Sequence, residues 1–172
     1  MWKTDTERYE DRYERYAKQL RRAGVVLLEN ESVLLPETGI RIFGVEIDMD
    51  YYKKLRKSVM KVSYLNSLLG RPCADEYNIL LAHNPDYFQA YAGWGADLVL
   101  SGHVHGGIMR LPVLGGVLSP ALRLFPRYDG GLYEEGKSKM VLGRGLGTHT
   151  LPIRVFNPGE LIVVRLEPER GN

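Results

Sequence analysis

The stretch LLAHNPDYFQAYAGWGADLVLSGHVHGG, residues 80–107, decides the fold and points to the chemistry of this chain. Two short apolar runs, Ile79–Ala82 and Leu98–Leu100, each end in a polar loop that carries histidine. Between them, Pro85 suits the first turn of a helix over Tyr87–Tyr91. The order strand, histidine loop, helix, strand, histidine loop predicts an α/β sheet with a site at the carboxyl ends of its strands.

The N-terminal segment predicts an amphipathic helix over about residues 5–22, closed by Gly24. Tyr9, Tyr13 and Tyr16 recur on one face at helical spacing, with Arg and Glu between them. A stripe of this kind usually faces a core. We therefore expect these tyrosines to be buried.

The rest of the chain has mostly strand and loop character. A second helix is expected over about residues 50–59, and residues 106–136 are rich in Gly and Pro and predict mostly loop. Further strand-like runs lie at Val25–Leu28, Ser32–Leu35, Ile40–Val45, Met140–Gly143 and Leu161–Leu166. The first three of these predict an antiparallel meander.

Composition places the chain among ordinary globular domains. Its 172 residues are 44% hydrophobic and 26% charged, which suits one domain over residues 1–172. A net charge of +2 gives no support to nucleic-acid binding. Cys73, the single cysteine, excludes an internal disulfide and a cysteine-based zinc site. The N-terminus lacks a signal peptide and no apolar run reaches the length of a membrane span, so we expect a cytoplasmic protein.

His103 and His105 form an H-x-H pair between glycines, which is a pattern typical of metal ligands. In extended backbone such a pair places both rings on one side. Cupins and amidohydrolase barrels share the pattern, but cupins require a nearby glutamate where Ile108, Met109 and Arg110 stand here. Too little chain follows His105 to form a barrel. Neither alternative therefore fits.

With AHNPD upstream of SGHVHGG, residues 80–107 resemble the fourth and fifth motifs of the calcineurin-like metallophosphoesterases. The tail LFPRYDGGLYEEGKSKMVLGRGLGTHTLPIRVFNPGELIVVRL, residues 124–166, resembles the bacterial membrane-phosphodiesterase-like branch of that family. The likeness runs over most of the chain. It implies a two-metal site, with Mn, Fe or Zn, that hydrolyses phosphate esters.

Carried over residue by residue, the resemblance implies that His83 and His103 bind one ion and that His105 binds the other. Asn84, after the lone histidine, is expected to be structural. Ile108 stands where relatives often carry a polar residue, which leaves substrate contact there unassigned. His149 lies in a polar connection and is also left unassigned.

The first three motifs of the family, D-x-H, G-D-x-x-D and G-N-H, do not occur in the sequence. They supply the bridging carboxylate, the remaining ligands and the leaving-group histidine, so no catalytic residue is assigned here. We expect the C-terminal portion of the family's α/β sandwich: one sheet with flanking helices, and the second sheet largely missing. The resulting apolar surface favours self-association or pairing with an N-terminal half.

Two functions follow from these observations. The first is a metal-dependent phosphodiesterase or phosphomonoesterase. In this case the chain is active only when the missing motifs are present in the same or another chain. The alternative is a non-catalytic metal-binding or interaction module. The branch resembled suggests a phosphodiester or lipid-linked phosphate as substrate. Arginines with the charge for anion binding, each more simply a surface residue, are Arg110, Arg123, Arg127 and Arg144. Asp86, Asp97 and Asp129 are expected to serve a helix start, a strand start and a turn.

Overall fold

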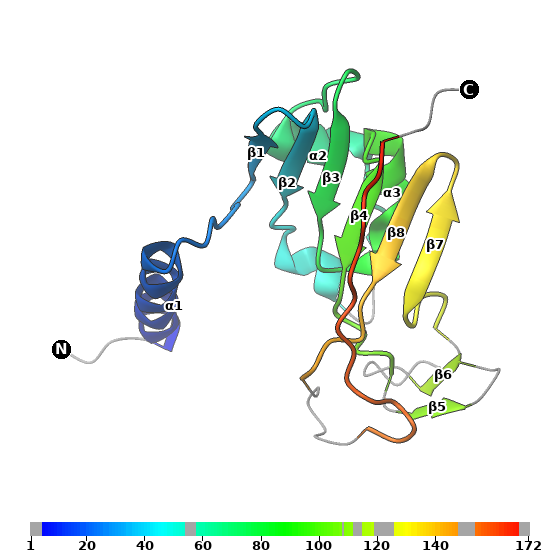
Figure 1. The fold of residues 1–172 in the computed structure, drawn as a ribbon. Helices are drawn as coiled ribbons and strands as arrows, with labels where there is room; N and C mark the ends of the chain where they lie inside the picture. The colour runs from blue at the N-terminus through cyan, green and yellow to red at the C-terminus, as the bar shows by residue number, and fades with distance from the viewer. Residues whose placement is uncertain are drawn as a thin grey trace.

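The computed structural model describes residues 5–53, 58–107, 109–111, 115–118, 126–147 and 154–168. Its centre is one six-stranded sheet with the strand order β1-β2-β3-β4-β8-β7 (Figure 1). The strands are β1 (Glu31–Leu35), β2 (Ile40–Gly44), β3 (Tyr77–Leu81), β4 (Leu98–Ser101), β7 (Gly131–Glu135) and β8 (Ser138–Leu142). A separate pair, β5 (Met109–Leu111) and β6 (Gly115–Leu118), lies beyond one end of this sheet. The expected single sheet with flanking helices is confirmed.

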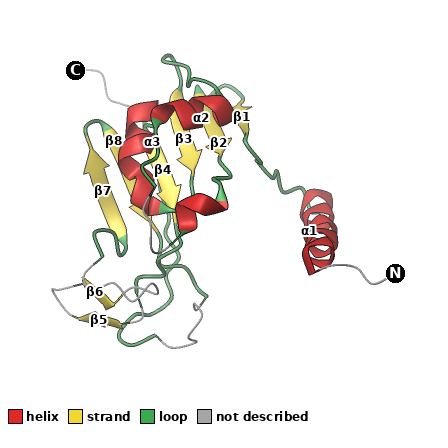
Figure 2. Cartoon of the chain, turned by 180° about the vertical axis from the view of Figure 1, so that it is seen from behind, coloured by secondary structure: helices red, strands yellow, loops and turns green. Residues whose placement is uncertain are grey.

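The four central strands β2, β3, β4 and β8 are parallel, and antiparallel strands close both edges. The crossovers from β2 to β3 and from β3 to β4 contain α2 (Val62–Leu69) and α3 (Phe88–Trp94). Because successive crossovers of one hand place their helices on one face, α2 and α3 cover the same side of the sheet (Figure 2). Because β3 and β4 are parallel neighbours, their carboxyl ends lie next to each other at the same end of the sheet.

The core lies between this face and the two helices. Phe88, Tyr91 and Trp94 of α3 are buried, and the indole of Trp94 packs edge-on against Phe43 with ring centroids 4.9 Å apart. The Trp94 Nε1 donates a hydrogen bond to the Gly70 carbonyl at 2.8 Å, which ties α3 to the end of α2. On the opposite face, the red end of the C-terminal segment (residues 154–168) runs along β4 in Figure 1, while the orange beginning of that segment lies beyond the end of the sheet.

The N-terminal helix, α1 (Asp5–Arg22), forms where the sequence predicts it. It lies apart from the sheet, connected by residues 23–30 (Figure 1). The exposed fractions of Tyr9 and Tyr16 are 72% and 60%, so the expectation of a core-facing tyrosine stripe is wrong. Helical periodicity places side chains on one face of a helix but does not supply the surface that covers it.

Three further expectations differ from the structure. Val25–Leu28 and Leu161–Leu166 are not strands, which reduces the expected three-stranded meander to the β1–β2 hairpin. The second helix is a short 3-10 turn, η1 (Met49–Tyr52), and residues 54–57 of the expected range lie outside the described residues. The α-helix of this region is α2, which begins at Val62, after the expected range. Across the described residues, no helix is both long enough and apolar enough to cross a membrane.

Candidate metal centre

The two histidine loops are held together at the carboxyl ends of β3 and β4. Beyond the strands the pairing continues, because Ala82 N–H donates to the Leu100 carbonyl at 3.1 Å and Gly102 N–H to the His83 carbonyl at 3.1 Å. The Ser101 hydroxyl also donates to the Ala82 carbonyl at 2.6 Å. The backbone carrying His83 is therefore bonded directly to the backbone that leads to the H-x-H pair.

The imidazoles of His83 and His103 are neighbours, with ring centroids 5.3 Å apart in an edge-to-face arrangement. Tyr52, at the end of η1, also packs edge-on against His103, at a centroid distance of 5.2 Å. His83 is exposed, and His103 and Tyr52 are partly exposed. Two histidines separated by twenty residues thus meet at the sheet edge, as the motif order predicts.

The backbone of the H-x-H pair is not extended. The φ angles of His103 and His105 are 70° and 49°, in the left-handed region that side-chain-bearing residues rarely adopt. Val104 N–H donates to the Gly102 carbonyl and Gly107 N–H to the Val104 carbonyl, both at 2.8 Å, so two tight turns follow each other. The expectation of extended backbone is wrong because these turns reverse the chain within the motif. A left-handed residue of this kind stores about 1–3 kcal/mol of strain, which is typical of functional sites.

His83 is biased toward its neutral form. Burial, and secondly the nearby charge of His105, lower the pKa of its imidazole below the ordinary value. A neutral imidazole has the free lone pair that a metal ligand needs, so this environment suits ligation.

The donor set fits a transition metal in part. Imidazole nitrogens suit Mn, Fe or Zn, and His83 and His103 are close neighbours. In the part of the chain that the structure describes, however, no group of three His, Cys, Asp or Glu side chains is arranged to hold an ion. His149, left unassigned from the sequence, and Ile108 lie outside the described residues. The described histidines can therefore form one side of a metal site.

Asp86 and Asp97 have the structural roles expected of them, whereas Asp129, expected in a turn, forms an ion pair. Asn84 accepts a hydrogen bond from Asp86 N–H at 3.1 Å and caps the 3-10 turn η2 (Pro85–Tyr87), which leads into α3. The Asp97 carboxylate accepts one from Asn78 N–H at 2.7 Å at the start of β4. Asp129 forms an ion pair with Arg110 at 3.0 Å.

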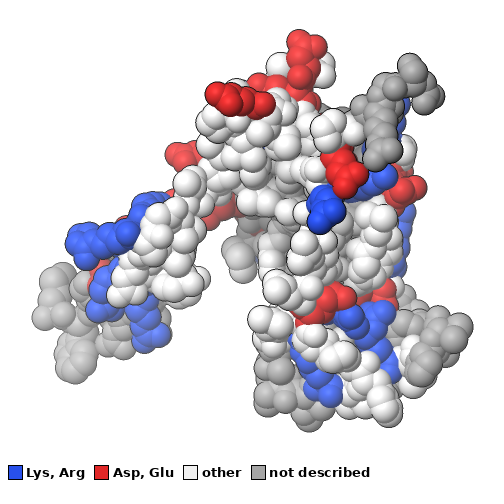
Figure 3. Space-filling model, viewed as in Figure 1, with Lys and Arg blue, Asp and Glu red and all other residues white. Residues whose placement is uncertain are grey.

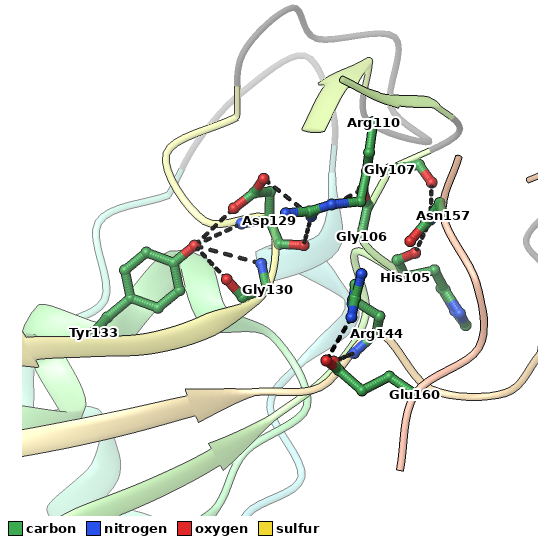
Figure 4. Close-up of polar contacts among 10 residues, drawn as sticks. All are labelled: His105, Gly106, Gly107, Arg110, Asp129, Gly130, Tyr133, Arg144, Asn157 and Glu160. Carbon is green, nitrogen blue, oxygen red and sulfur yellow. Dashed lines mark hydrogen bonds and ion pairs between the residues drawn. The ribbon is translucent and has the colours of Figure 1, made fainter. Parts of the chain in front are cut away.

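Two candidate anion-binding arginines are already paired within the protein. Arg110 donates to the Asp129 carboxylate and to its carbonyl, both at 3.0 Å, and Arg144 contacts Glu160 at 2.6 Å (Figure 4). The Arg144 guanidinium holds the pKa of the Glu160 carboxyl below its usual range. These arginines brace the loops around the histidines. Arg127, at the surface, lies over the ring of Tyr128, and Arg123 lies outside the described residues.

Asn157 is the site residue that sequence reasoning missed. It lies in the C-terminal segment, 2% exposed, and its Nδ2 donates to the carbonyls of His105 and Gly107 at 2.7 Å each (Figure 4). No local motif marks it, because its partners lie some fifty residues earlier in the chain. Tyr52 was missed for the same reason, since it reaches His103 only through folding.

Charged side chains gather around this end of the sheet. Figure 3 shows blue and red groups next to each other at the lower end of the molecule. Among the described residues, Arg110 pairs with Asp129 and Arg144 with Glu160, whereas Arg154 donates to the carbonyls of Arg144 and Gly145.

Several curated bacterial proteins are similar to this chain in sequence. An uncharacterized metallophosphoesterase of Bacillus subtilis, YkuE, is 35% identical over 91 residues, which cover 53% of this chain and 31% of YkuE. The phosphodiesterase YaeI of Escherichia coli is 38% identical over 80 residues, which cover 45% of this chain and 29% of YaeI. The UDP-2,3-diacylglucosamine pyrophosphatase LpxG of Chlamydia muridarum is 30% identical over 151 residues, which cover 81% of this chain and 40% of LpxG.

The chain spans about half the length, or less, of the curated relatives that it matches. No family model and no solved structure matched it. The similarity to metallophosphoesterases therefore rests on sequence matches to individual relatives, each of which is longer than this chain.

Proposed function

Because the chain is related to the bacterial metallophosphoesterases, as its motifs predict, we propose that it forms the C-terminal side of a metal-dependent phosphoesterase site. In this proposal His83 and His103 hold one divalent ion and His105 contributes to a second. When bound, the two ions provide positive charge for the attacking and leaving oxygens and acidify a water molecule. Phosphate-ester hydrolysis is the reaction that results.

The observation that carries this proposal is the contact between His83 and His103. Two imidazoles from different loops lie side by side, with ring centroids 5.3 Å apart, at the carboxyl ends of adjacent parallel strands. Such edges are where α/β sheets generally bind their ligands. The lowered pKa of His83 adds to the argument, since a neutral ring binds a cation without first losing a proton.

In this proposal, the contacts of each site residue indicate its role. His83 and His103 present ring nitrogens, and Tyr52 packs against His103 and limits how far that ring turns. The Arg110–Asp129 pair supports the loop after the histidines. Because Arg110 and Arg144 are engaged in ion pairs, we assign neither of them to the substrate phosphate.

For the substrate we propose a phosphodiester, with lipid-linked phosphates included. YaeI is named a phosphodiesterase, and the name of LpxG describes cleavage of a diphosphate carrying a diacylated sugar. Both are relatives of this chain and neither name transfers directly to it. What they share is an ester or anhydride of phosphate that two cations can polarise.

A second function, a non-catalytic metal-binding module, is favoured by one specific observation. Among the described residues, no three ligand-type side chains group together, so the histidines need further ligands to complete a catalytic centre.

For the enzyme, we propose that carboxylates and an asparagine outside these 172 residues complete the catalytic centre. The chain alone is then expected to bind metal more weakly than a complete site.

Metal binding and turnover test the proposal together. Isothermal titration with Mn²⁺ should show that His103→Ala removes most of the affinity, because the ring between His83 and Tyr52 is lost, whereas His149→Ala should remove little. Equal affinity for Mn²⁺ in the wild type and in His103→Ala would contradict the assignment.

The same proteins are assayed for hydrolysis of an aryl phosphodiester with Mn²⁺. Turnover that disappears in His103→Ala would support the enzyme. Metal binding without turnover would mean that this chain alone lacks ligands needed for catalysis, which both the incomplete enzyme site and the non-catalytic module predict.

A further inference from the structure

The C-terminal segment holds the backbone of the H-x-H pair through one side chain. The Asn157 amide nitrogen donates to the carbonyl of His105 and to that of Gly107, both at 2.7 Å. These two carbonyls lie on either side of Gly106, in the second of the two tight turns. Figure 4 shows Asn157 beside this turn, on the side away from Asp129.

The orientation of the amide is determined by its partners. Both neighbours are carbonyl oxygens, which only accept, so the nitrogen must face them. The Asn157 Oδ1 then faces Gly106, and no described residue donates a hydrogen bond to it. A side chain at position 106 would bring its Cβ within 2.6 Å of that oxygen. Asparagine and glycine therefore fit each other closely at this point.

The turn needs such a restraint. His105 has a φ of 49° and Gly106 a φ of 73°, so consecutive residues adopt the left-handed conformation. For His105 this conformation is unfavourable unless the surroundings enforce it. Two hydrogen bonds from a side chain that is 2% exposed supply a fixed point for the backbone at His105 and Gly107.

We propose that Asn157 is a positioning residue for the metal site: it fixes the turn that aims the His105 imidazole. This inference rests on the proposed function, because it takes His105 to be a ligand. Replacing a residue that hydrogen-bonds to a metal ligand and orients it typically changes metal affinity 10–100-fold. Asn157 would do so through the backbone rather than through the ring.

The chain contains a control for this test. Asn78 is also buried, 3% exposed, and its Nδ2 donates to the carbonyls of Cys73 and Glu76 at 2.9 Å each. The same nitrogen lies 3.5 Å from the Asp97 carboxylate, and the Asn78 Oδ1 has no hydrogen-bond partner among the described residues. Asn78 is the second residue of β3, at the end away from the histidines. Replacing either asparagine by aspartate turns two hydrogen bonds to carbonyls into repulsion between oxygens, and at position 78 the new carboxylate also faces that of Asp97.

The first measurement is the affinity and visible spectrum of Co²⁺, a probe whose absorption reports the arrangement of its ligands. We expect Asn157→Asp to weaken Co²⁺ binding about 10–100-fold and to change the spectrum. Asn78→Asp should leave the spectrum as in the wild type, whatever its effect on stability. Wild-type affinity and an unchanged spectrum in Asn157→Asp would overturn the proposal.

The second measurement needs no metal. Hydrogen exchange at the Gly107 amide, which donates to the Val104 carbonyl inside the turn, should be faster in Asn157→Asp than in Asn78→Asp. If the wild type binds no Co²⁺, the proposed metal function fails, while this exchange rate still decides whether Asn157 holds the turn. Unchanged exchange in Asn157→Asp would overturn that role as well.

A milder variant covers the case in which Asn157→Asp does not fold. Asn157→Ala removes the two donors without adding a buried charge, and it should weaken Co²⁺ binding in the same direction. A folded Asn157→Ala protein with wild-type affinity and wild-type exchange at Gly107 would contradict the inference.

Discussion

Helices α1 and α3 both carry aromatic residues at helical spacing, yet their surroundings are opposite. Phe88 and Tyr91 of α3 are 1% and 0% exposed, whereas Tyr9 and Tyr16 of α1 are 72% and 60% exposed. The helix α3 is joined to β3 and β4 by short connections that press it onto the sheet. The helix α1 is joined only through residues 23–30 and stands apart (Figure 1). Periodicity shows that a helix has an apolar face, and chain connectivity determines whether that face is covered.

The largest expected effect is the loss of a core aromatic from α3. Phe88→Ala should lower the free energy of unfolding by about 3–5 kcal/mol, because it leaves a cavity where the ring packs near Tyr128. Urea unfolding measures this loss. Tyr16→Ala on α1 is the control, expected to change stability by no more than about 0.5 kcal/mol. Similar losses from both variants would remove the contrast between the two helices.

A pH titration tests one of the two side-chain contacts described between α1 and Glu29, the other being the Arg21–Glu29 ion pair. The Tyr13 hydroxyl donates to Glu29, and this hydrogen bond, followed by burial, raises the Tyr13 pKa from 10.0 to about 12. The absorbance of tyrosinate, compared with that of Tyr13→Phe, should show this value. In Glu29→Gln the midpoint should fall back toward 10.0.

The sign of the stability change follows from the direction of the shift. Because the folded protein holds the Tyr13 proton more tightly, the contribution is complete below pH 10 and is lost as the pH rises through about 12. A Tyr13 midpoint near 10 in the wild type would mean that α1 is detached from Glu29 in solution.

The smallest expected effect comes from removing most of α1. Deleting residues 4–17 should leave the thermal transition nearly unchanged, because the described tyrosines of this helix are exposed rather than part of the core. Differential scanning calorimetry of the shortened chain checks this. A large fall in the transition temperature would show that the tyrosine stripe is covered in solution, either by this chain or by a second copy.

The candidate site could be predicted in its location but not in its backbone. Parallel strands end at the same edge of a sheet, so apolar runs followed by histidines place His83 near His103. The left-handed angles at His103 and His105 were not foreseen, because glycines on both sides fit an extended chain and a tight turn equally well. The supporting Asn157 had no local signal at all.

The same division applies to the secondary structure. The boundaries of α1 and the positions of β3 and β4 follow from periodicity and apolar runs. The helix α2 has 8 residues and lies later in the chain than the helix expected over about residues 50–59. It forms against α3 and the sheet, where the fully buried Leu65 joins the core.

By itself, the sequence determined the helix α1, the positions of β3 and β4, the kinship with metallophosphoesterases, and the placement of His83 and His103 after two neighbouring strands. These properties are encoded in short segments, whose residues interact with their neighbours along the chain. Only the tertiary structure decided that α1 stands off the sheet and that Asn157 anchors the H-x-H turn. It also decided that the arginines near the site are paired. Such contacts join residues far apart in the chain, and their energies depend on geometry that no local pattern contains.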